Sequence, residues 1–139
     1  MIILDTSIAI KWILPGEIHE SIAKSILEDH LSTKQDILVP DLFYYEIANT
    51  LATKTSVPSF VITRSLNKIY DFNLKLYHPQ AIDVLKAARL SKKYATTTYD
   101  MLYAVIAKSH QADLITADSN FVKKTGFKFV HFIGNYNLN

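Results

Sequence analysis

Short apolar runs alternate along this sequence with longer segments in which apolar residues recur at helical spacing. We expect strands at residues 2–4, 37–39, 74–77, 114–116 and 127–132. Strands that alternate with helices in this way are typical of a parallel sheet buried on both faces. The pattern therefore predicts an α/β fold with three layers, α/β/α, and a central parallel sheet.

Capping residues and prolines mark the expected helices. These helices cover residues 8–13, 18–31, 42–52, 60–70, 80–94, 99–110 and 119–126. Thr6 or Ser7 is expected to cap the first helix, which Pro15 ends. No linker or repeat divides the chain, and we expect one domain over residues 1–139.

Composition excludes several functional classes. The 139 residues contain no cysteine, so disulfides, thiolate zinc sites and cysteine nucleophiles are excluded. The first strand is expected to begin at Ile2, which leaves no room for a secretion signal, and no apolar run is long enough to span a bilayer. We expect a cytoplasmic protein that does not contact membranes. The net charge of +2 decides little about partners.

Three aspartates are expected at one edge of the sheet. Asp5 follows the first strand, Asp118 follows the fourth, and Asp100 begins the helix that leads into the fourth. Each alone is explained by helix capping, because carboxylates suit helix N-termini. Ligands of parallel sheets bind beyond the carboxyl ends of the strands, however, so the three together indicate a site.

Glu46 is a fourth acidic candidate, and it is harder to explain structurally. It lies in an apolar helix about one turn beyond the second strand. Burial of an unpaired carboxylate is costly, so either a salt bridge or a site at the sheet edge must account for it.

Four converging carboxylates would repel one another unless a cation offset their charge. Carboxylate oxygens favour hard cations such as Mg²⁺ or Mn²⁺. The five histidines show no paired ligand spacing, which argues against zinc. Lys11 is a candidate phosphate contact, although a solvated helix lysine is the simpler expectation.

Four short blocks, at residues 3–7, 45–51, 98–104 and 115–121, resemble the PIN domain family, and most of all its VapC-type toxins. The resemblance implies a Mg²⁺- or Mn²⁺-dependent endoribonuclease that acts on single-stranded RNA, with products that carry a 5′-phosphate and a 3′-hydroxyl. It also implies a homodimer and inhibition by a VapB-type antitoxin.

The resemblance assigns residues as well. Asp5, Glu46, Asp100 and Asp118 match the four acidic positions of the family, as catalytic residues and metal ligands, and Ser7 and Thr116 match supporting hydroxyls. Met101 departs from the pattern, because the family often has a small residue after the third acid. The larger side chain could alter helix packing or the groove.

Two other functions remain open from the sequence. A non-catalytic RNA- or protein-binding module would keep the fold without the chemistry. A receiver-like phosphoacceptor domain also uses aspartates at strand ends, but it requires a lysine after a late strand, and none follows the strand expected at 127–132.

Overall fold

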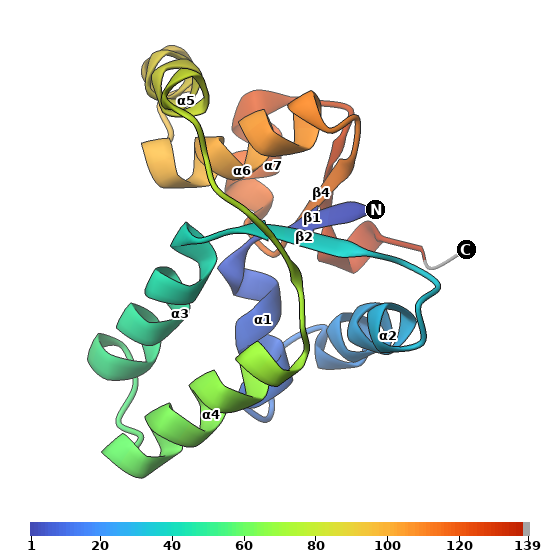
Figure 1. The fold of residues 1–139 in the computed structure, drawn as a ribbon. Coiled ribbons are helices and arrows are strands. Elements are labelled where there is room, and N and C mark those ends of the chain that lie inside the picture. The colour runs from blue at the N-terminus through green and yellow to red at the C-terminus, as the bar shows by residue number, and fades with distance from the viewer. Residues whose placement is uncertain (138–139) are drawn as a thin grey trace.

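The computed structural model describes residues 1–137, which form a five-stranded sheet with helices on both sides (Figure 1). In chain order the elements are β1 (Ile2–Leu4), α1 (Thr6–Ile13), α2 (Glu20–Leu31), β2 (Ile37–Pro40), α3 (Leu42–Thr53), α4 (Ser59–Asp71), β3 (Lys75–Tyr77), α5 (Ala81–Tyr94), α6 (Thr98–Ser109), β4 (Asp113–Thr116), α7 (Ser119–Thr125), β5 (Val130–Phe132) and a 3₁₀ turn at Ile133–Asn135. The predicted three-layer α/β/α architecture is confirmed.

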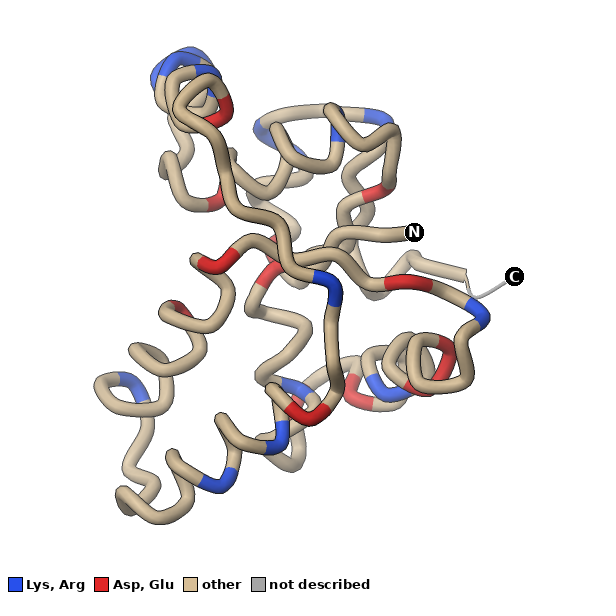
Figure 2. The backbone as a smooth tube through the Cα atoms, viewed as in Figure 1, with Lys and Arg blue, Asp and Glu red and all other residues tan. Residues whose placement is uncertain are grey.

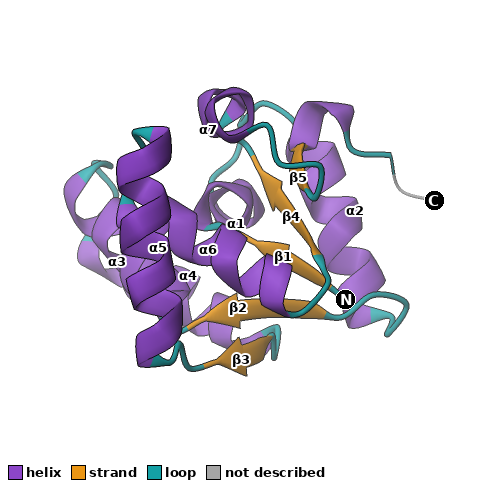
Figure 3. Ribbon diagram, turned by 90° about the horizontal axis from the view of Figure 1, so that it is seen from above, coloured by secondary structure: helices purple, strands orange, loops and turns teal. Residues whose placement is uncertain are grey.

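The sheet has the order β3-β2-β1-β4-β5, and every pair of neighbouring strands is parallel (Figure 3). The chain therefore builds outward from β1 to β3 and then crosses to β4 on the other side of β1. The carboxyl ends of β1 and β4 flank this reversal, where open parallel sheets bind ligands. The topology places the residues that follow these two strands at the position predicted for a site.

The two helical layers bury the sheet from opposite sides. Helices α1 to α4 lie below the sheet in Figure 1, and α5 to α7 lie above it. Helix α6 packs on β1 and β4, and the sheet residues Ile3, Leu4 and Val39 are fully buried. Seven consecutive residues of α6 are buried, so this helix forms the centre of its layer. None of the helices at positions 1–137 is long and apolar enough to cross a bilayer.

Most predicted element boundaries agree with the structure to within two or three residues. The cap of α1 was predicted wrongly: Asp5, and not Thr6 or Ser7, is the N-cap, and its side chain accepts from the Ser7 backbone. The first expected turn of α2 lies outside the helix, which begins at Glu20. β5 is shorter than expected, because only Val130–Phe132 pairs with β4.

Met101, the departure from the family pattern, is a core residue of α6. Its side chain is fully buried, beside an apolar pocket that also contacts Leu90, Val105 and Phe127. The larger side chain is thus accommodated by packing between α6 and its neighbours.

Candidate active site

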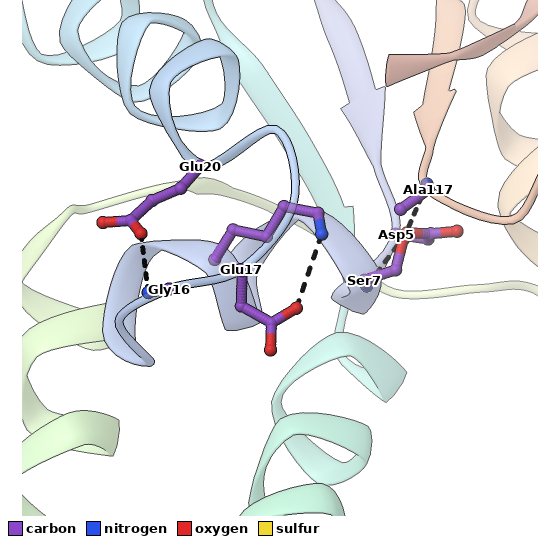
Figure 4. A network of polar contacts seen from close by, with 7 residues as sticks. Asp5, Ser7, Gly16, Glu17, Glu20 and Ala117 are labelled. Atoms are coloured by element: carbon purple, nitrogen blue, oxygen red, sulfur yellow. Dashed lines mark hydrogen bonds and ion pairs between the residues drawn. The ribbon is translucent and has the colours of Figure 1, made fainter. Parts of the chain in front are cut away.

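Asp5 occupies the carboxyl end of β1, where it is held by the first turn of α1. Its Oδ1 accepts a hydrogen bond from the Ser7 backbone nitrogen at 3.0 Å and another from the Ser7 hydroxyl. The same hydroxyl oxygen accepts from the Ala117 backbone nitrogen at 2.8 Å, as Figure 4 shows. Ser7 therefore fixes the position of Asp5 and ties the end of β1 to the segment that follows β4.

The pKa of Asp5 is shifted strongly by its surroundings. Burial raises the pKa from 3.8 to about 6, while hydrogen bonding to Ser7 and Thr116 lowers it and the charge of Asp100 raises it further. Thr116 is fully buried, and its hydroxyl oxygen accepts from the Asp118 backbone nitrogen at 2.9 Å. The two hydroxyls predicted to support the site thus contact its first and last acids.

Glu46 projects from α3 toward α6. Its Oε1 accepts from the hydroxyl of Tyr103 at 2.6 Å. Burial raises the pKa of Glu46, the Tyr103 hydrogen bond lowers it, and the Asp100 charge raises it. Glu46 forms no salt bridge with any partner in residues 1–137, so the structural explanation left open by the sequence does not apply.

Tyr103 is the residue of this site that sequence reasoning did not identify. It is 1% exposed, and its pKa is raised by burial and by the charges of Glu46, Asp5 and Asp100. Glu46 therefore contacts the phenol directly, and the charges of Asp5 and Asp100 also act on it. The signal in the sequence was its spacing, because a residue three positions after Asp100 shares a helix face with it.

Asp118 is the N-cap of α7, and Asp100 lies in the first turn of α6, whose N-cap is Thr97. Thr97 donates its hydroxyl to Asp100 Oδ2 at 2.8 Å and accepts from the Asp100 backbone nitrogen at 3.1 Å. Asp118 Oδ1 accepts from two backbone nitrogens at the start of α7, each at 2.9 Å. Both acids also line one pocket of about 410 Å³. The hydrogen bonds that Asp100 and Asp118 form at the starts of two helices therefore leave both acids at this pocket.

The donor set suits a hard divalent cation. Asp5, Glu46, Asp100 and Asp118 offer only carboxylate oxygens, and none forms a salt bridge within the described residues. With the side chains as they stand, no three His, Asp or Glu groups in residues 1–137 are placed to hold one metal ion. Mg²⁺ commonly takes one or two protein carboxylates and keeps several waters, so such a site does not require three converging groups.

Lys11 does not match either expectation from the sequence. It is 6% exposed, and its ammonium group lies 3.6 Å from a carboxylate oxygen of Glu17. It is therefore neither a solvated lysine nor a cation that faces the acids.

Comparisons with known proteins bear on the family and the fold. Residues 2–127 match the family model for the PIN domain. No curated protein matches the sequence.

Solved structures show the same fold over almost the whole chain. VapC20 from Mycobacterium tuberculosis, a sarcin-ricin loop cleaving toxin, has a TM-score of 0.69 at 14% identity and covers 94% of this chain and 99% of its own. A toxin-antitoxin complex from Klebsiella pneumoniae has a TM-score of 0.69 at 16% identity, and the match covers 99% of this chain and 100% of the other. VapBC2 from Rickettsia felis, bound to a DNA fragment from its promoter, has a TM-score of 0.68 at 17% identity. This match covers 95% of this chain and 98% of the other. At these identities the likeness concerns the fold.

Proposed function

The chain belongs to the PIN domain family, and on that premise we propose that it is a Mg²⁺- or Mn²⁺-dependent endoribonuclease that hydrolyses single-stranded RNA. One observation carries the proposal: Tyr103 of α6 donates to Glu46 of α3 at 2.6 Å, beside Asp5 and Asp100 whose charges also raise its pKa, and none of these acids forms a salt bridge within residues 1–137. Uncompensated carboxylates at the carboxyl edge of a parallel sheet favour a cation from solution.

The four acids have different roles in this proposal. Asp5, Asp100 and Asp118 hold the cation directly or through water, and Glu46 completes the cluster. Tyr103 holds Glu46 Oε1, which leaves Oε2 to orient a water molecule beside the phosphate. When bound, the cation lowers the pKa of a water and stabilises charge that develops on the phosphate.

Ser7 and Thr116 are proposed to keep Asp5 ionised. Both lower the pKa of Asp5 against the effect of burial. A carboxylate that stays ionised at neutral pH binds a cation without first having to lose a proton.

The structural neighbours also support a biological setting. They include a toxin and toxin-antitoxin complexes. We propose that this chain is the toxin of such a pair, that it forms a homodimer and that a VapB-type antitoxin inhibits it. Size-exclusion chromatography with light scattering tests the dimer, and co-expression with the protein encoded next to it tests the antitoxin.

A cleavage assay tests the enzymatic proposal. A 5′-labelled single-stranded RNA is incubated with the protein in Mg²⁺, in Mn²⁺ or in EDTA. We expect cleavage only with a divalent cation, and its loss in Asp5→Asn and Asp100→Asn variants that remain folded by circular dichroism. Asp113→Asn is the matched control, because Asp113 begins β4 at the opposite edge of the sheet and pairs with His131.

Two results would contradict the enzymatic proposal. RNA binding with no cleavage in either metal would favour a non-catalytic module. Cleavage that survives in Asp100→Asn would mean that the acids assigned here do not perform the reaction. If the protein does cleave RNA, sequencing of the cleavage sites in cellular RNA after controlled expression would identify its target.

A further inference from the structure

A second feature of the site is a lysine of α7 that lines the same pocket as two of the acids. Lys124 lines the pocket of about 410 Å³ that also contacts Asp100, Asp118 and Asn120. The pocket therefore shares Asp100 with the cluster around Tyr103 and extends away from it toward the loop between α5 and α6. A strand of RNA bound with one phosphate at the acids would continue across this pocket.

The ammonium group of Lys124 is held in place without being neutralised. Its Nζ donates to the carbonyl oxygen of Ala95 at 2.7 Å, at the carboxyl end of α5. No carboxylate in the described part of the chain lies within salt-bridge distance of it. An ammonium group has three N–H donors. One contact with a carbonyl leaves two donors and the whole charge available.

Capping of α5 is the structural explanation of this contact, since a cation near a helix carboxyl end satisfies free carbonyl groups. That explanation does not require the lysine to line a pocket with two of the proposed catalytic acids. Further lysines lie near the same helix ends, where they too complement the helix dipoles. Lys92 and Lys93 lie in the last turn of α5, and Lys123 and Lys124 lie in the last turn of α7. Figure 2 shows lysine or arginine positions on both of these helices.

We propose that Lys124, assisted by the side-chain amide of Asn120, binds an RNA backbone phosphate next to the one that is cleaved. This inference rests on the proposed ribonuclease function and extends it. Lysine contacts phosphate as a point charge, so the contact is independent of base sequence. Because Asp100 and Asp118 would repel an anion in the same pocket, the phosphate binds there together with the divalent cation. Lys124 thereby sets the direction in which the strand leaves the acids.

The test measures RNA binding rather than cleavage. Binding of a fluorescein-labelled oligouridylate is followed by anisotropy in Mg²⁺ over a series of salt concentrations. The Asp5→Asn protein serves as the background, because it leaves the Lys124 pocket unchanged and is expected not to cleave. Lys124→Gln is added to this background, since glutamine removes the charge but keeps an N–H donor. Lys123→Gln is the matched control, with the same charge change on an exposed neighbour outside the pocket.

We expect Lys124→Gln to weaken binding about 3- to 10-fold and to reduce the slope of log K against log salt by about 0.7, the value for one phosphate contact on a single strand. Lys123→Gln should leave the slope unchanged. Equal effects of the two variants, or no effect of either, would overturn the inference while cleavage by the wild type left the ribonuclease proposal intact. Absence of oligouridylate binding by all three proteins would also overturn the inference, whereas absence of metal-dependent cleavage by the wild type would overturn the ribonuclease proposal.

Discussion

The hydroxyl of Tyr103 donates to Glu46 Oε1 across 2.6 Å and joins α6 to α3 over the carboxyl edge of the sheet. This hydrogen bond is a direct contact between the two helices that carry Asp100 and Glu46. It links Glu46 to the other acids of the candidate site, because the charges of Asp5 and Asp100 also raise the pKa of Tyr103.

Replacement of Tyr103 by phenylalanine should shift the pH dependence of RNA cleavage to higher pH. The hydrogen bond lowers the pKa of Glu46, so its loss raises that pKa, and an ionised Glu46 then requires a more alkaline solution. We expect the loss of activity to be larger in acid than in alkaline solution. Tyr99→Phe, an exposed position on the same helix, should leave the pH profile of kcat/KM unchanged. An unshifted profile in Tyr103→Phe would show that the phenol does not tune Glu46.

The metal-free protein should lose stability as pH rises toward neutrality. Asp5 in the folded protein keeps its proton up to a pKa of about 6, whereas its ordinary value is 3.8. The folded state therefore binds more protons between these values. Its stabilisation is fully present below pH 3.8 and is lost as pH rises through about 6.

Asp5→Asn isolates this effect. The variant should be more stable than the wild type at neutral pH in EDTA, by about 1 to 2 kcal/mol once the partial exposure of Asp5 is allowed for. The difference should vanish near pH 4 and also when Mn²⁺ binds to the wild type. Urea denaturation at both pH values measures it. Equal stability of the two proteins at neutral pH in EDTA would mean that burial does not raise the pKa of Asp5.

Ser7→Ala should destabilise the protein. The substitution removes the acceptor of the Ala117 N–H and one donor to Asp5. An unsatisfied, partly buried amide costs about 1 to 2 kcal/mol. The pKa of Asp5 should also rise, because the Ser7 hydrogen bond lowers it.

Urea denaturation of the serine variants checks this expectation. Ser25→Ala is the control, since its hydroxyl bonds back to the Ser21 carbonyl within α2 and its loss should change the free energy of unfolding by less than about 0.5 kcal/mol. Equal effects of the two substitutions would show that Ser7 does not tie the two strand ends together.

Thr96→Val should stabilise the protein. The hydroxyl oxygen of Thr96 is buried and has no hydrogen-bond partner in the described residues. Valine has the same shape without the polar group, so a gain of about 1 kcal/mol in thermal or urea unfolding is expected. Thr63→Val, on exposed α4, should be close to neutral. A loss of stability in Thr96→Val would reveal a partner for its hydroxyl.

The sequence by itself determined the elements and their order. Apolar runs end at Asp5 and just before Asp118, and these positions fall at strand ends because side-chain periodicity and capping act within a few residues. The family resemblance identified the same acids. Capping of α3 is equally local, because the Asp41 side chain accepts from the Leu42 backbone nitrogen.

The tertiary structure alone decided which side chains meet. Tyr103 and Glu46 are 57 residues apart, and Ser7 and Ala117 are 110 apart. No local pattern encodes such contacts, because they depend on strand order and on how α3 and α6 pack against the sheet. The sequence also did not indicate that Lys11 is buried. Its pairing with Glu17 depends on the conformation of the loop after α1. The shifted pKa values follow from this packing, since burial is a property of the assembled layers.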